Sequence, residues 1–442
     1  MLRAIVFYAM VAGGVPLSIF EPFYGLLLYL FFAHAHPADF VWSGYIFNYG
    51  MVLVPALIVG YVIFEARKSP PLLRGMILLL AFWLWLTAAT VLAYDTPTAF
   101  AMLTRFSKMF VVSFIIAALA NTEARIGTML RVIAISLGLL GLKGLLDIIL
   151  TGGRYRMQGP GGMLSEENEY SLGMNMAIPM LYWLATVEER RWLRRLYQLA
   201  ALGCAATVVF TYSRSGFLGL ILVCFLIAVH SRRKWLAPAG LAAFALLFIL
   251  FAPQGAIDRY KTIPTASQTD PSAIGRLQAW ETAVQMAKAH PFFGVGLRNF
   301  ELTFSNYTAY EPRAPHNAFV ALTAESGIPS CLLFIAVIFA AIVGNWLRYR
   351  RLRRDPGHRL LATYCLIVHS TLIVYIVPNL FINRQDFDLM YHLVGLSAGM
   401  HMVIQRKLMA QLEPIEAPLE AATGPYADVL GQPGQPCAVE GK

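Results

Sequence analysis

The sequence predicts an all-α, polytopic transmembrane helical bundle of about 12 spans. Of the 442 residues, 58% are apolar and only 14% are charged, which is too little charge for most soluble domains. Apolar runs of about 20 residues, long enough to cross a hydrocarbon core of ~30 Å, recur along the chain. These runs are continuous, whereas strands of a membrane barrel would alternate in segments of ~10 residues. The clearest runs are 75–94, 130–150, 215–230, 236–252, 328–346 and 360–382.

The first 34 residues fit either a cleavable signal peptide or membrane helices. Arg3, the apolar stretch after it and the sequence AHAHP resemble a signal peptide. Pro16, Glu21 and Pro22 interrupt this stretch, which is also long. We therefore predict two short membrane helices here.

Basic residues cluster in every second connection between the apolar runs, which places those connections in the cytoplasm. The net charge of +10 would suggest nucleic acid in a soluble protein, but this pattern accounts for it, and no nucleic acid partner is expected. The prediction is a multi-pass protein of a bacterial inner membrane with a cytoplasmic C-terminal tail. Its parts are N-terminal transmembrane helices (1–252), a large periplasmic loop with a helix (253–319), C-terminal transmembrane helices (320–405) and a disordered tail (406–442) rich in Pro, Gly, Ala and Glu.

The long outer connection predicts one helix over 269–291. Asp270 is a suitable cap, Pro271 suits the first helical position, and His290–Pro291 would end the helix. Arg276 falls in its first turns, and the glycine turn GVGLRNF that follows carries Arg298. The spacing predicts one apolar stripe, made of Leu277, Trp280, Val284 and Ala287.

Two residues at predicted outer helix ends are candidates for chemistry. Arg214 lies in the short turn TYSRSG between two apolar helices, where it either binds an anion or extends to lipid headgroups. His316 follows the long loop and has an ordinary pKa of about 6.5, so it is either a proton acceptor or an interfacial histidine. Asn317 either caps the next helix or contacts substrate.

A glycine-rich outer loop, TGGRYRMQGPGGM at 151–163, carries Arg154 and Arg156. Backbone amides of such a loop can hold an anion, but the pattern is neither a P-loop nor a dinucleotide fingerprint. Ser165 is a plausible N-cap for the helix that follows, with Glu166 and Glu167 complementing its dipole.

Metal and disulfide sites are not expected. HAH (34–36) and DFD (386–388) are short, isolated pairs, and helix capping explains Asp386 equally well. The five cysteines have neither CxxC nor metal-ligand spacing. We expect no cofactor.

The predicted outer face thus combines one base with several arginines. Arginine binds phosphate in a bidentate manner and keeps its charge. This combination suits an anionic, lipid-linked substrate. Its members are His316, Arg214, Arg276, Arg298, Arg154 and Arg156.

Three segments resemble the O-antigen ligase/polymerase superfamily, namely TYSRSGFLGL, GRLQAWETAVQMAKAHPFFGVGLRNF and PHNAFVALTAESGIPS. The resemblance covers residues 150–385 and includes the histidine–asparagine element with Glu325 and Gly327 downstream. The final glycine of that pattern is Ser330 here. The subgroup that looks most similar contains O-glycosylation ligases accompanying exosortase systems.

The resemblance implies a GT-C-like glycosyltransferase of the Gram-negative inner membrane. Such enzymes transfer a glycan from undecaprenyl diphosphate to a periplasmic acceptor, lipid A–core in O-antigen ligases. It implies His316 as the base and Arg214 and Arg276 as diphosphate ligands. The remaining candidates, Arg298, Asn317, Arg154 and Arg156, are expected to make further substrate contacts.

Three alternatives remain open from the sequence. A polymerase and a protein O-glycosylation ligase would need the same base and arginines. A transporter or flippase of a lipid-linked glycan would show internal repeats and charges near mid-membrane, and neither is evident.

Overall fold

The computed structural model shows that the chain folds into helices. Every regular element in the described part is a helix, which confirms the predicted all-α class. The chain divides into two units, Met1–Val403 and Ile404–Lys442, and the features discussed below belong to the first. Most of the predicted tail and most of the apolar run 236–252 lie outside the described residues. The described residues are 2–40, 48–65, 74–231, 235, 239–240, 242 and 271–411.

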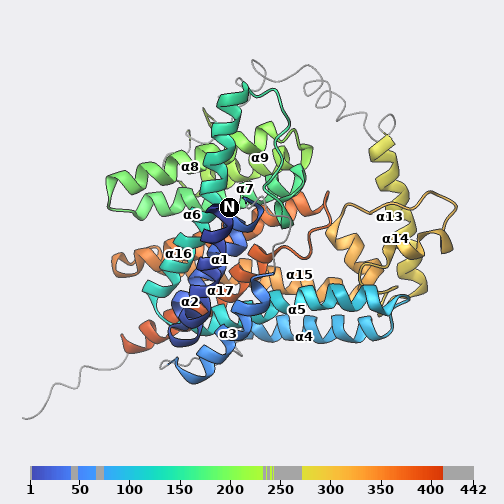
Figure 1. The fold of residues 1–442 in the computed structure, drawn as a ribbon, viewed down its shortest axis with the longest axis horizontal. Helices are drawn as coiled ribbons and strands as arrows, with labels where there is room; N and C mark the ends of the chain where they lie inside the picture. The colour runs from blue at the N-terminus through green and yellow to red at the C-terminus, as the bar shows by residue number, and fades with distance from the viewer. Residues whose placement is uncertain are drawn as a thin grey trace, which may run out of the picture. The chain divides into compact units, whose positions relative to one another are not determined.

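The helices and their order along the chain are drawn in Figure 1. Their bounds are α1 (Leu2–Phe20), α2 (Pro22–Ala35), α3 (Gly50–Ile63), α4 (Arg74–Val91), α5 (Thr96–Leu119), α6 (Glu123–Thr151), α7 (Glu167–Val187), α8 (Arg191–Phe210), α9 (Arg214–His230), α13 (Pro271–Ala289), α14 (Phe300–Thr303), α15 (Ala318–Leu352), α16 (Arg359–Asn379) and α17 (Asp388–Ala410). Short 3₁₀ turns cover Pro37–Phe40, Gly162–Leu164, Phe304–Asn306 and Pro356–His358.

Several of these helices have the length and apolarity of membrane spans. Among the described residues, five reach this standard: α1, α5, α6, α15 and the segment Pro356–Asn379 that contains α16. Shorter apolar helices are Pro22–Ala35, Gly50–Ile63, Gly75–Val91 and Arg214–His230. The chain is therefore a membrane protein built from helices.

The N-terminal region contains two helices, as predicted. The chain breaks at Glu21, and Pro22 occupies the first turn of α2, where its missing N–H costs no hydrogen bond. Pro16 does not end a helix, because it lies inside α1.

Glycines allow α7 and α9 to approach closely beside the predicted arginine turn. A Cβ on Gly216 would lie 2.5 Å from the Ser171 hydroxyl, and one on Gly219 would lie 2.7 Å from the Asn175 amide nitrogen. The Asn175 amide also donates to the Gly216 carbonyl over 2.8 Å. These contacts hold the start of α9 next to the start of α7.

The long helix α15 bends at Gly327, whose φ of 84° is left-handed. A Cβ at this position would overlap the carbonyl oxygen of Phe292, so only glycine fits. Other elements satisfy the backbone groups that the bend releases. The hydrogen bonds run from Val295 N to Ala324 O (3.0 Å), Gly296 N to Glu325 O (2.8 Å), Ile328 N to Pro291 O (2.9 Å) and Trp85 Nε1 to Ser326 O (3.1 Å).

Ser330, which replaces a glycine of the family pattern, also serves this bend. Its hydroxyl donates to the carbonyl oxygens of Gly327 and Leu322, at 2.9 Å and 3.3 Å. Leu322 precedes the non-helical residue Gly327 and Ser330 follows it, so the hydroxyl bridges the two parts of α15. The departure from the family pattern therefore has a local structural role.

Helix α13 confirms the helix predicted within 269–291, and it ends at Ala289, just before His290 and Pro291. The proposed cap Asp270 lies outside the described residues. α13 packs against α15 (Figure 1).

The apolar stripe predicted on α13 is not its buried face. Leu277 and Val284 are 49% and 51% exposed. The buried face consists instead of Ala279, Ala283 and Met286, which join a cluster with the loop after α13 and with α15. Short side chains allow close packing between helices, and a pattern that weights large apolar residues misses that face.

Candidate active site

His316 lies on a short segment that is held on both sides. Before it, the indole Nε1 of Trp280 on α13 donates to the carbonyl oxygen of Pro315 over 2.7 Å. After it, the backbone N–H of Asn317 donates to the Asn383 side-chain oxygen over 2.6 Å. His316 has a φ of 47°, a left-handed conformation that is uncommon outside glycine. Such backbone geometry persists where surrounding contacts impose it.

Asn317 begins α15 as its N-cap. Its side-chain oxygen accepts hydrogen bonds from the N–H groups of Phe319 and Val320, at 3.0 Å and 3.1 Å. The side chain is therefore used in capping, the alternative that the sequence left open for it.

The electrostatic surroundings of His316 favour its neutral form. The residue keeps an exposed surface, yet surrounding protein atoms partly desolvate the ring, and this is the main cause that lowers its pKa below the ordinary value. The positive charge of Arg276 lowers the pKa further, while Glu166 and Glu301 oppose the shift. A neutral imidazole can accept a proton, which a general base must do.

Arg276, near the start of α13, therefore lies close enough to His316 for its charge to act on the imidazole. Arg276 is half-buried. The preceding residue, Gly275, has no side chain, which leaves room for a second cation, Arg313. A Cβ on Gly275 would overlap the guanidinium of Arg313. Arg313 lies three residues before His316 and also pairs with Glu311 over 3.8 Å. Motif resemblance does not single out Arg313, because this residue precedes the segment PHNAFVALTAESGIPS.

Arg214 is the first residue of α9. Ser213 caps the helix by accepting from the N–H of Gly216 at 3.1 Å. The same hydroxyl donates to the Asn168 side-chain oxygen over 2.6 Å, which joins this turn to the start of α7. Tyr212 has a φ of 54°, so the turn, like that of His316, is conformationally constrained. A helix N-terminus with an arginine is a favourable place for an anion.

Helix α7 connects the Arg214 turn with the surroundings of His316. Asn168 bonds the Arg214 turn, and Glu166, two residues earlier, influences the pKa of His316. The arginine turn and the histidine segment therefore lie around the same end of α7.

Arg156 is engaged with protein groups. It forms an ion pair with Glu167, and its Nε donates to the carbonyl oxygen of Thr211 over 3.2 Å. These contacts tie the glycine-rich loop to the arginine turn. Arg154 is exposed on the same loop. The prediction that Ser165 caps α7 is wrong, because the N-cap is Glu166, without a side-chain cap bond.

Arg298 takes part in the structure of the glycine turn through its backbone N–H. It has a φ of 62°, and its N–H, with that of Phe300, donates to the buried Glu325 carboxylate. Glu325 therefore anchors the glycine turn to α15, while the Arg298 side chain is left exposed.

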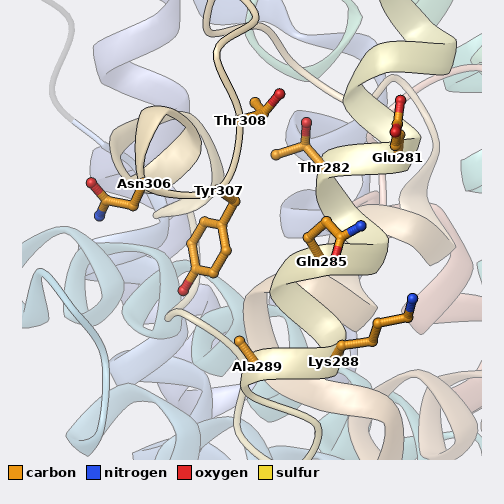
Figure 2. A pocket seen from close by; sticks show the side chains of 8 residues that line it. All are labelled: Glu281, Thr282, Gln285, Lys288, Ala289, Asn306, Tyr307 and Thr308. Carbon is orange, nitrogen blue, oxygen red and sulfur yellow. The ribbon is translucent and has the colours of Figure 1, made fainter.

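A polar cavity of about 530 Å³ lies along α13 from Glu281, the residue after Trp280, to Ala289. Figure 2 shows that side chains from α13 and from the 306–308 segment line opposite sides of it. Among its residues, Glu281 also accepts a hydrogen bond from the Tyr310 hydroxyl over 3.4 Å. Its lining consists of Glu281, Thr282, Gln285, Lys288, Ala289, Asn306, Tyr307 and Thr308.

The short motifs HAH and DFD engage other protein groups. Nε2 of His34 lies 3.0 Å from Nδ1 of His392. Asp386 forms an ion pair with Arg105 over 3.1 Å, rather than the helix cap considered from the sequence. Within the part of the chain that the structure describes, no group of three or more His, Cys, Asp or Glu residues is placed to hold a metal ion.

Fold and site together define a polytopic helical membrane protein with a histidine and arginines gathered near helix ends. Residues 199–335 match a family model described as O-Antigen ligase, so the chain carries a domain of the O-antigen ligase superfamily. Residues 2–189 match a second model, described only as a family of unknown function. No curated protein sequence matches the chain. The match thus relates residues 199–335, less than a third of the chain, to the O-antigen ligase family.

Proposed function

We propose that the protein is an O-antigen ligase that transfers a glycan from undecaprenyl diphosphate to lipid A–core at the periplasmic face of the Gram-negative inner membrane. The observation that carries the proposal is that a hydrogen bond from Trp280 holds the His316 segment to α13, the helix whose Arg276 acts electrostatically on His316. This arrangement supplies a fixed positive charge for a diphosphate and also favours the neutral imidazole that a base requires.

The proposed reaction is a single displacement at the anomeric carbon. His316 takes the proton of the acceptor hydroxyl while its oxygen forms a bond to that carbon. The bond from the carbon to the diphosphate oxygen breaks, and the departing electron pair becomes negative charge on the diphosphate. Arg276 and Arg214, with the N-terminus of α9, stabilise this charge. Attack opposite the leaving group inverts the anomeric centre.

No metal is required by this proposal. The diphosphate is a good leaving group without protonation, and arginines supply the positive charge that a cation would otherwise provide. Arg313 is a further candidate diphosphate contact, because its guanidinium lies against Gly275. The polar cavity of Figure 2 offers hydroxyl, amide and charged groups beside the site, and we propose that the transferred glycan extends along it.

To test the ligase proposal, the His316→Ala variant is expressed in cells that lack the native protein. The level of membrane-inserted protein is measured in the same cells. A ligase predicts loss of lipid-A-linked polymer and accumulation of undecaprenyl-linked polymer. Shortened chains with single units still attached would identify a polymerase instead. Loss of glycan from a protein, with lipid A still modified, would identify a protein O-glycosylation ligase. Normal attachment would contradict the catalytic role of His316.

A further inference from the structure

The motifs HAH and DFD, more than 340 residues apart in sequence, meet at one pocket that none of His316, Arg276 and Arg214 lines. His36 and Asp388 line this pocket, which has a volume of about 410 Å³, within the range of small-ligand sites. We call it the Arg105 pocket. Its lining consists of Tyr29, His36, Ala38, Asn48, Tyr49, Gly50, Val54, Arg105, Lys108, Met109, Gly162, Met163 and Asp388.

The region of unknown function builds almost all of this pocket. Every lining residue except Asp388 falls within 2–189, the part of the chain matched by the family of unknown function. The O-antigen ligase match begins only at residue 199. The pocket is therefore formed by the N-terminal region together with Asp388, the first residue of α17.

The positive side of the pocket is held in place by a buried carboxylate. Asp386 is 3% exposed and pairs with Arg105 over 3.1 Å. Arg384 lies 4.0 Å from the other oxygen of Asp386 and pairs with Glu169 of α7 over 3.1 Å. This chain of ion pairs fixes the Arg105 guanidinium at the pocket, and Lys108, one turn later on α5, adds a second cation.

Two short segments connect the pocket to the candidate base. Asn383 accepts from the backbone of Asn317, next to His316, and Asp388 lines the pocket. Five residues of chain separate these two, a reach of at most about 18 Å. Met163 also lines the pocket. Glu166, which influences the pKa of His316, follows Met163 by three residues, so their Cα atoms are at most about 11 Å apart.

The lining has the chemistry that recognises an anionic saccharide. Tyr29 and Tyr49 offer aromatic faces with polar tips, which suit the C–H faces and hydroxyls of a sugar ring. Asn48 and Asp388 can bond sugar hydroxyls. Arg105 and Lys108 match a phosphate or carboxylate.

We propose that the Arg105 pocket binds an anionic saccharide and that, resting on the function proposed above, this saccharide is part of the acceptor. The anionic group is held by Arg105 and Lys108, so that a neighbouring hydroxyl of the acceptor is directed toward His316. An acidic or phosphorylated sugar is then a requirement for efficient transfer.

The test measures binding without catalysis. The full-length protein in phosphatidylcholine nanodiscs is titrated with N-acetylglucosamine 1-phosphate, with N-acetylglucosamine and with inorganic phosphate. The phosphorylated sugar is expected to bind at least about tenfold more tightly than either other compound, since both the ring and the charge are recognised. Equal binding of the neutral sugar, or equal binding of phosphate alone, would overturn the proposal.

Matched variants locate the site. Lys108→Gln is expected to remove most of the preference for the phosphorylated sugar, whereas Lys143→Gln, the same change at an exposed lysine on α6, is expected to keep it. Asn48→Asp retains the oxygen that accepts from the N–H of Gly50 at 3.0 Å and adds negative charge, so it should weaken the same ligand. If both Lys108→Gln and Asn48→Asp bind as the wild type does, the pocket is not the site.

Two further measurements distinguish a saccharide from a lipid headgroup, and binding from catalysis. Nanodiscs containing phosphatidylglycerol should leave binding unchanged, and complete competition by this lipid would identify a lipid headgroup as the occupant and overturn the proposal. His316→Ala should bind the phosphorylated sugar as the wild type does. The binding measurement therefore tests the pocket independently of the proposed catalytic role of His316.

Discussion

The indole nitrogen of Trp280 lies 2.7 Å from the carbonyl oxygen of Pro315, the residue directly before His316. This hydrogen bond ties the segment that carries the proposed base to α13, the helix that also carries Arg276. The distance between base and arginine therefore depends on the Trp280 hydrogen bond. Trp280 acts as a positioning residue.

Trp280→Phe keeps an aromatic ring and removes the hydrogen bond to Pro315. We expect the free energy of unfolding to fall by about 1 kcal/mol. Transfer should lose about tenfold in kcat with little change in KM, because the base is misplaced while the diphosphate contacts remain. Steady-state kinetics with a lipid-linked donor checks this. Trp192→Phe, at an exposed position on α8, is the control and should change neither constant. A change confined to KM would contradict the positioning role.

Gly327→Ala tests the bend in α15. The left-handed φ and the nearby Phe292 carbonyl leave no room for a Cβ, so we expect a loss of at least about 1–3 kcal/mol of stability. Thermal unfolding of the purified protein measures it. Gly75→Ala is the matched control, because a Cβ there meets nothing within 4 Å and the residue is helical, so stability should be unchanged or slightly raised. Equal stability of the two variants would show that the bend is not required.

The pH dependence of transfer reports the environment of His316. Partial desolvation and the charge of Arg276 lower its pKa, so the neutral base persists below the ordinary value of about 6.5. As pH is lowered, the transfer rate should therefore begin to fall only below the pH expected for a histidine with the ordinary pKa of about 6.5. Arg276→Gln removes the positive charge, which raises the pKa of His316 and moves the acidic limb of the profile to higher pH.

Arg276→Lys provides the control for this shift, because it keeps the charge and loses the bidentate geometry. It should lower the overall rate while leaving the acidic limb near the wild-type position. If Arg276→Gln and Arg276→Lys have the same acidic limb, the charge of this arginine does not act on the base.

The sequence predicts the helical class, the paired N-terminal helices and α13 because long apolar runs and helix-ending residues are local signals. The sequence does not identify which face of α13 is buried. Hydrophobic periodicity selects Leu277 and Val284, but the contact with α15 needs the short side chains of Ala279 and Ala283. Which face packs depends on the partner helix, and a single segment does not contain that information.

The candidate site shows the same limit. Motif resemblance singles out His316 and Arg276, and in the folded chain the charge of Arg276 acts on His316. The motif resemblance does not reveal Arg313, Asn383 or the hydrogen bond of Trp280. Their positions at the site arise only through contacts between distant parts of the folded chain. The Arg105 pocket depends on the same long-range contacts, since His36 and Asp388 meet only in the folded chain.

Single-turnover transfer by purified His316→Ala tests the central claim most directly, with donor binding measured on the same sample. We predict a rate about 10²–10⁴-fold below wild type with donor affinity unchanged, because the acceptor loses its base while the arginines still hold the diphosphate. A rate within about threefold of wild type, with the protein folded and donor bound, would contradict general-base catalysis by this residue.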